Sequence, residues 1–227
     1  MKSTSKLPKS FVWSTLTIFA LAIIVTSLFA KAEIPPGIEI DTTNQPTQGY
    51  ANAPIQIVVF EEPKCSSCSD FSKDIYPKLK KEFIDTKKVR YTLILVSFLP
   101  NSMPAAEAML CVYYSDPEYP NSDHFFEYSD YIYQHQPNED TDWCKTPLLL
   151  DFAKKTNPAI NLEKLKDCIT RDTYRIQIEK NTAYAKEVMG GGISTPTLYL
   201  DGVQIKEFNY EMLSSRIKEL LKQKGVH

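Results

Sequence analysis

The sequence predicts an α/β protein in which a block of helices separates two parts of one sheet. Residues 55–60 and 89–96 are apolar runs that flank a helical pattern, which is typical of a strand-helix-strand unit. Near the other end, two short apolar runs at 197–200 and 203–205 enclose Asp201-Gly202, a dipeptide that favours a tight hairpin turn. The residues between these two units carry helical periodicity.

The first 32 residues predict a signal peptide or an N-terminal membrane anchor. Three lysines precede an uncharged apolar stretch over residues 11–30, and Ala30-Lys31-Ala32 matches a signal-peptidase cleavage pattern. Cleavage is favoured, although twenty apolar residues are also long enough to cross a bilayer. We therefore expect a periplasmic or other extracytoplasmic protein, either soluble after cleavage or held at a membrane by residues 11–30.

The remaining chain divides into a linker and a folded part. Residues 33–53 are rich in proline and have few periodic apolar positions, which predicts a tether. We expect the first half of the sheet unit at 54–100, a helical insertion at 101–189 and the second half at 190–227. The net charge of -2, without a basic stripe or a glycine-rich phosphate loop, argues against nucleic-acid binding.

Each expected helix has its own signal. After the first strand, apolar residues recur every four positions and predict one helix bent at Pro77, with Phe71, Ile75, Leu79 and Phe83 on one face. In the insertion, Ser102 is an expected N-cap for a helix through Tyr114, and a long helix covers about 172–188. The last helix is amphipathic, with Tyr210, Leu213, Ile217, Leu220 and Leu221 on its apolar face.

Aromatic residues are concentrated between Tyr113 and Tyr133. They could be read as a base-stacking or cofactor platform. Since aromatic side chains most often supply buried area, we interpret them as helix-packing core and peptide-contacting surface. No cofactor is expected.

Cys65-Ser66-Ser67-Cys68 directly follows the first predicted strand and is the main functional signal. Two thiols at this spacing can form a disulfide, and a thiolate at the start of a helix is stabilised by the helix dipole. The same spacing also occurs in zinc sites, but those need two further ligands. Three isolated cysteines and His124, His135 and His227 make a poor ligand set, so redox chemistry is preferred over a metal site or a purely structural disulfide.

The chain resembles the DsbA-like branch of the thioredoxin superfamily, exported thiol-disulfide oxidoreductases with a thioredoxin fold that contains an inserted all-helical domain. The resemblance is carried by four motifs in order: Val58-Val59-Phe60 leading to the cysteine pair, Ala105-Ala106, Cys111, and Gly192-Ile193-Ser194-Thr195-Pro196-Thr197. Together they span most of the chain after Ala53. The long interval between the cysteine pair and Thr195-Pro196 distinguishes this branch from plain thioredoxins.

The resemblance implies a role for each site residue. Cys65 would be the exposed nucleophile, Cys68 the buried resolving thiol and Pro196 a cis-proline facing them, with the Thr195 hydroxyl near the Cys65 sulfur. The helix N-terminus and Lys64 are the expected stabilisers of the thiolate. Strongly oxidising members carry Pro-His between the cysteines, whereas Ser66-Ser67 offers only hydroxyls, so we expect a weaker oxidant.

Some members of the family bury an acidic residue six positions before the nucleophile. In this chain that position is occupied by Val59. Glu61 or Glu62 would then have to assist proton transfer from Cys68. The alternative is that both are solvated loop carboxylates, the usual state of such residues.

Three cysteines remain in the insertion. Family position favours a disulfide between Cys111 and Cys168, and Cys144 with Cys168 is the other pairing considered. Cys144 is the leading candidate for a free thiol.

These expectations lead to one function and two alternatives. The main hypothesis is an exported enzyme that transfers a Cys65–Cys68 disulfide to reduced or unfolded exported proteins and is re-oxidised by a quinone-linked membrane partner. A reductase or isomerase of the same compartment is the first alternative. A non-catalytic metal chaperone or binding module is the second.

Overall fold

The computed structural model describes residues 37–207 and 209–226. The predicted signal peptide or anchor lies outside these residues. Within them, no helix combines the length and apolar character needed to cross a membrane.

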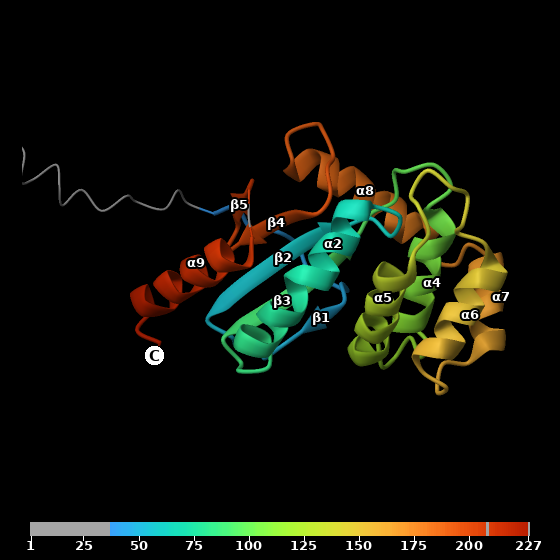
Figure 1. The fold of residues 1–227 in the computed structure, drawn as a ribbon, viewed down its shortest axis with the longest axis horizontal. Helices are drawn as coiled ribbons and strands as arrows, with labels where there is room; N and C mark the ends of the chain where they lie inside the picture. Colours follow the sequence, from blue (N-terminus) through green and yellow to red (C-terminus); the bar gives the residue numbers. More distant parts are fainter. Residues whose placement is uncertain (1–36, 208, 227) are drawn as a thin grey trace, which may run out of the picture. The chain divides into compact units, whose positions relative to one another are not determined.

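The centre of the fold is a five-stranded sheet with the strand order β1-β3-β2-β4-β5 (Figure 1). Strands β2 (Ile55–Glu61) and β3 (Val89–Leu95) pair in parallel, as expected for a strand-helix-strand unit. Strand β4 (Thr197–Leu200) pairs antiparallel with β2, and β5 (Val203–Ile205) forms the edge beside β4. The middle of the sheet is therefore built from both ends of the folded part.

The β4–β5 hairpin turns at Asp201 and Gly202, as the sequence predicts. Both residues have positive φ, 47° and 78°, which is the backbone that a two-residue hairpin turn of this kind needs. The Asp201 carboxylate also accepts a hydrogen bond from the Gln56 amide at 2.8 Å. This contact ties the turn to the start of β2.

The prediction that residues 33–53 form a tether is wrong for the part that the structure describes. Strand β1 (Thr47–Gln48) pairs antiparallel with β3. The Ile40 side chain is buried in the core, and the Asp41 amide donates to the Tyr184 hydroxyl at 2.8 Å. The proline content of this segment did not prevent β1 from pairing with β3. An edge strand of two residues needs few backbone N–H donors.

The helix predicted after the cysteines is divided into three segments. They are α2 (Ser66–Asp74), α3 (Tyr76–Leu79) and a π-helical turn, η1 (Lys80–Ile84). The division falls at Ile75, two residues before Pro77. A proline lacks the N–H needed to bond back to the preceding turn, and its ring crowds that turn, so the helix is divided there where a simple bend was expected.

Five helices form the insertion between β3 and β4, as Figure 1 shows. Their bounds are α4 (Met103–Tyr113), α5 (Ser122–His135), α6 (Thr146–Thr156), α7 (Leu162–Thr170) and α8 (Arg175–Val188). The C-terminal helix α9 (Tyr210–Gln223) buries Leu213, Ile217, Leu220 and Leu221, the face predicted from its periodicity. The aromatic residues Phe125, Phe126, Tyr128 and Tyr133 of α5 are buried, which confirms their interpretation as core.

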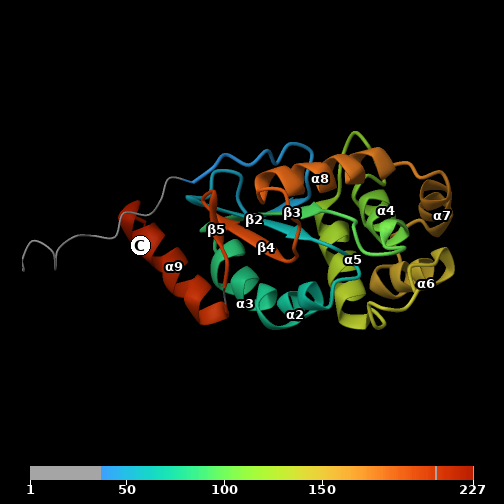
Figure 2. The same cartoon turned by 90° about the horizontal axis from the view of Figure 1, so that it is seen from above.

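The two faces of the sheet are covered by different helices. On one face α8 packs through Ala185 on Val58, Phe60 and Ile94 of the central strands. In Figure 2 the helices α2, α3 and α9 lie on the opposite face, while α4 to α7 gather beyond one end of the strands. The start of α2 therefore lies at the end of the sheet that faces the inserted block.

Ser102 precedes α4 as predicted, but its side chain makes no capping bond. Its hydroxyl instead lies 2.7 Å from the Ser97 hydroxyl. The position of the helix start was correct, and the expected N-cap contact is absent.

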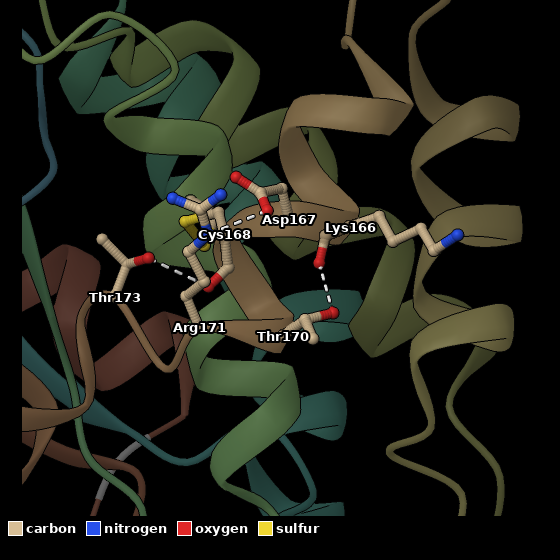
Figure 3. A network of polar contacts seen from close by, with 7 residues as sticks. Lys166, Asp167, Cys168, Thr170, Arg171 and Thr173 are labelled. Atoms are coloured by element: carbon tan, nitrogen blue, oxygen red, sulfur yellow. Dashed lines mark hydrogen bonds and ion pairs between the residues drawn. A yellow bond between two sulfur atoms is a disulfide. The ribbon is translucent and has the colours of Figure 1, made fainter.

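A disulfide joins Cys111 of α4 to Cys168 of α7 across 57 positions of the chain. Figure 3 shows Cys168 near the end of α7, where the Arg171 guanidinium pairs with Asp167 at 2.9 Å. The Thr173 hydroxyl donates to the Cys168 carbonyl at 3.0 Å, so this end of the helix is closed by side chains. The covalent bond holds two helices of the insertion together far from the first cysteine pair in sequence.

Candidate active site

Cys65 occupies the N-cap of α2, after the short segment 62–64 that follows β2. Its backbone is extended, with φ -63° and ψ 122°, and Cys68 follows in the first helical turn. The Cys65 side chain is 8% exposed whereas Cys68 is fully buried, and both are free thiols. Both residues are therefore buried, in contrast to the exposed position expected for Cys65, although Cys65 is less completely buried than Cys68.

The Thr195–Pro196 peptide bond is cis. The Cys65 thiol donates a hydrogen bond to the Thr195 carbonyl oxygen, with 3.3 Å between sulfur and oxygen. Thr195 and Cys65 are 130 residues apart in the sequence, and the β2–β4 pairing brings them together.

The environment of Cys65 favours its thiolate. Hydrogen bonding from the Cys68 thiol, opposed by burial and assisted by Thr195 and by the Cys68 and Ser67 amides, lowers the pKa of Cys65 to about 6. The Thr195 hydroxyl is buried and has no hydrogen-bond partner among the described residues. The structure therefore contains donors that can be satisfied by a negatively charged sulfur.

Cys68 has the opposite electrostatic environment. Burial, the hydrogen bond with Cys65 and the charge of Glu61 raise the pKa of Cys68 well above its ordinary value. The two thiols are thus held far apart in acidity. An ionised outer thiol beside a protonated inner thiol is the arrangement that thiol-disulfide exchange requires of a reduced pair.

Lys64 is placed differently from the sequence prediction. Its side chain is buried, and its ammonium donates to the Pro100 carbonyl at 2.8 Å. The main groups that favour the thiolate are the Cys68 thiol, Thr195 and two helix amides. The Lys64 ammonium therefore serves first to bind the loop after β3.

Ser66 and Ser67 both have exposed side chains at the start of α2. The Ser67 amide favours the Cys65 thiolate, whereas the Ser66 amide donates to the Glu139 carboxylate at 2.6 Å. Ser67 thus favours the Cys65 thiolate through its backbone amide, whereas Ser66 favours the Glu139 carboxylate through both its amide and its hydroxyl.

Glu61 and Glu62 are both buried, in contrast to the solvated state that is usual for such residues. Burial raises the pKa of Glu61 to about 8, although the Tyr133 and Tyr91 hydroxyls favour its charged form. Burial likewise raises the pKa of Glu62 to about 7, against the Ser102 hydroxyl and the Lys64 amide. Glu61 is the carboxyl that contributes to the high pKa of Cys68.

Sequence reasoning missed the contacts that the inserted block makes with the active-site segment. Gln136 donates to the carbonyl oxygens of Lys64 and Cys65 at 3.3 and 3.2 Å. Glu139 binds the Ser66 amide, and the Ser69 hydroxyl donates to the Tyr133 carbonyl at 2.6 Å. No local pattern could have indicated these pairs, because 64 to 73 residues separate their members.

The third cysteine outside the disulfide is Cys144. It is a free, buried thiol, which confirms the prediction that Cys144 is unpaired. Burial raises its pKa to about 12. Across residues 37–207 and 209–226, no group of three or more histidine, cysteine or acidic side chains is arranged to hold a metal ion.

The fold and the thiol pair beside a cis-proline define a protein thiol-disulfide oxidoreductase. A family model described as Thioredoxin matches residues 41–219. The chain belongs to the DsbA-like thiol-disulfide oxidoreductases of the thioredoxin superfamily. This assignment replaces the hypothesis of a non-catalytic metal-binding module.

Individual relatives agree with the assignment. The chain is 34% identical over 182 residues to disulfide bond formation protein D of Bacillus subtilis, covering 79% of this chain and 78% of the relative. The crystal structure of Chlamydia trachomatis DsbA superposes with a TM-score of 0.76 at 35% identity, over 85% of this chain and all of the other. Oxidised BdbD of Bacillus subtilis gives a TM-score of 0.71 at 33% identity, over 80% and 95% of the two chains.

Proposed function

We propose that this protein is an exported oxidase that transfers a Cys65–Cys68 disulfide to reduced or unfolded exported proteins. The observation that carries the proposal is the placement of the pair: Cys65 is 8% exposed and lies against Thr195 of the cis bond, whereas Cys68 is fully buried. These environments lower the pKa of Cys65 to about 6 and raise that of Cys68. The relatives named for disulfide bond formation support the same direction.

The reaction transfers two electrons from the substrate to the enzyme. A substrate thiolate attacks the Cys65 sulfur, the Cys65–Cys68 bond breaks, and its electron pair leaves on Cys68, which takes up a proton. A second substrate thiolate then attacks the substrate sulfur of the mixed disulfide and releases Cys65 as a thiolate. The substrate gains one disulfide, and the enzyme is left reduced.

Glu61 is the proposed proton donor to Cys68. With a pKa of about 8, its buried carboxyl is mostly protonated at neutral pH. It can therefore give a proton to the Cys68 sulfur as that sulfur leaves, because the raised pKa of Cys68 makes its thiolate a strong base. During re-oxidation the same carboxylate accepts that proton again. This role fits general acid-base catalysis by a group whose pKa lies near the working pH.

The proposed oxidant is weaker than the Pro-His members of the family. Thiolate stabilisation favours the reduced form, so a lower pKa of the outer cysteine makes its disulfide more oxidising. A pKa of about 6 falls between the approximate values of 7 for thioredoxin and 3.5 for DsbA. We further propose export through residues 1–32 and re-oxidation by a quinone-linked membrane protein.

The test is turnover on a reduced, unfolded protein that needs disulfides. The oxidised wild type should restore disulfides to such a substrate, and Cys65→Ser should abolish the activity. Cys68→Ala should abolish it too, because without Cys68 the enzyme has no internal disulfide to transfer. Failure of the wild type to oxidise the substrate would contradict the proposal.

A reductase or isomerase is the second candidate, supported by the absence of histidine between the cysteines. Equilibration with glutathione separates the candidates. A potential near that of thioredoxin, about -270 mV, would favour reduction, and a clearly higher one oxidation.

A further inference from the structure

A carboxylate from the inserted block is bound to the first turn of the active-site helix. The Ser66 amide, at the first position of α2, donates to Glu139 at 2.6 Å from 73 residues away. The N-cap residue Cys65 offers no side-chain capping bond of its own. Glu139 therefore satisfies the N1 amide, which an N-cap side chain leaves free because such a side chain binds the N2 or N3 amide.

Glu139 is held in this position by an ordered loop. The Asn138 side chain accepts from the Asp140 amide at 2.8 Å, and its carbonyl accepts from the Thr141 hydroxyl at 2.7 Å. On the other side of Glu139, Gln136 donates to the backbone of Lys64 and Cys65. The loop is thus attached to the active-site segment at two separate points.

The first-turn amides are shared between two acidic groups. Those of Ser67 and Cys68 favour the Cys65 thiolate, while that of Ser66 binds Glu139 and lowers its pKa. Negative charge near a helix N-terminus is stabilised by the helix dipole. When both groups are charged, however, they repel each other at the same helix end.

We propose that Glu139 is a positioning residue that fixes the first turn of α2 and, through its charge, limits the oxidising strength of the Cys65–Cys68 pair. The inference rests on the proposed function in taking Cys65 as the sulfur that the substrate thiolate attacks. It goes further in assigning control of the redox equilibrium to a residue of the helical insertion.

Other charged groups face the same two residues. Around Cys65 they are the titratable groups Cys68, Glu61 and Glu62 and the ammonium group of the adjacent Lys64. Around Glu139 they are Lys64, whose charge favours the carboxylate, and Asp70, Lys73 and Asp140, which line the adjoining groove. A substitution confined to Glu139 leaves all of these in place.

The experiment compares Glu139→Gln with the wild type in two measurements that need no turnover. Glutamine keeps an oxygen for the Ser66 amide and removes the charge. Thiolate absorbance against pH gives the Cys65 pKa. Equilibration with glutathione gives the redox constant, that is, the equilibrium constant between the oxidised and reduced forms of the Cys65–Cys68 pair. We expect the acid dissociation constant of Cys65 to increase about two- to fivefold, the size of a helix-terminus charge effect, and the redox constant to shift by the same factor toward the reduced pair.

Two matched variants show whether the effect belongs to the charge at position 139 or to any negative charge of this loop. Asp140→Asn removes a neighbouring charge of the same loop, and Glu139→Asp keeps the charge at position 139. Each should give less than half of the Glu139→Gln change. An unchanged Cys65 pKa in Glu139→Gln, or an equal shift in Asp140→Asn, would overturn the proposal.

A measurement on the unsubstituted protein covers the case in which Glu139→Gln does not fold. The carboxyl carbon-13 shift of Glu139 in the reduced protein should show an inflection at the Cys65 pKa, and the oxidised protein should show none. Absence of that inflection would refute the coupling, whether or not the wild type oxidises protein substrates.

Discussion

The Cys65 thiol donates to the carbonyl oxygen of Thr195, the residue that enters the cis bond to Pro196. The hydroxyl of the same threonine is buried and has no hydrogen-bond partner in the described part of the chain, so it is available to donate to the Cys65 thiolate. One residue therefore offers the Cys65 sulfur both an acceptor and a donor. The acceptor suits the neutral thiol, and the donor suits the thiolate.

The donor role of Thr195 can be tested with Thr195→Val, which keeps the shape and removes the hydroxyl. A hydrogen bond to a charged group contributes about 1.5 to 3 kcal/mol, so the Cys65 pKa should rise by about one to two units. Thiolate absorbance against pH measures this change. In Thr197→Val, whose hydroxyl donates to Ser194, the pKa should stay where it is in the wild type.

Ionisation of Cys65 should make the stability of the reduced protein depend on pH. The pKa is about 6 in the fold against 9.0 for an ordinary thiol. Because the folded value is depressed, the stabilisation is complete above pH 9 and is lost as the pH falls to 6. The difference amounts to at most about 4 kcal/mol.

Denaturant unfolding of the reduced and oxidised proteins measures this dependence. The free energy of unfolding of the reduced form should rise relative to the oxidised form between pH 6 and 9. Cys65→Ser should remove the slope. Parallel pH profiles for the two forms of the wild type would contradict the assignment.

Glu61 should have the opposite effect, which is best measured in the oxidised protein, where Cys65 does not titrate. Its pKa is raised from 4.5 to about 8 by burial, so its stabilisation is present below pH 4.5 and is lost as the pH rises to 8. Glu61→Gln should flatten the pH profile of unfolding by up to a few kcal/mol. It should also slow turnover near neutral pH, and Glu179→Gln, on the exposed side of α8, is the control.

The disulfide between Cys111 and Cys168 should stabilise the fold without tuning the active pair. Closing a loop of this length contributes about 4 kcal/mol in the chain-entropy account. The double variant Cys111→Ala/Cys168→Ala should lose about this much free energy of unfolding and retain the Cys65 pKa. A large shift in that pKa would show that the bond also acts on the active site.

The strands and the hairpin were predictable because they rest on local signals. The apolar runs of β2 and β3 and the Asp201-Gly202 turn are determined by neighbouring residues. The break at Ile75 was placed two residues too late, because Pro77 acts through the turn before it. Strand β1 was missed because two residues carry no periodicity that composition can reveal.

The sequence by itself determined the redox pair: Cys65 and Cys68 are spaced to share one helical turn after a strand, and the chain lacks a ligand set for zinc. Only the tertiary structure decided the electrostatic environment of that pair. In the folded chain Glu61 is buried, the Lys64 ammonium donates to the Pro100 carbonyl, and Glu139 accepts from the Ser66 amide. The physical reason is that burial and charge depend on which distant segments pack together, and local sequence does not specify those distances.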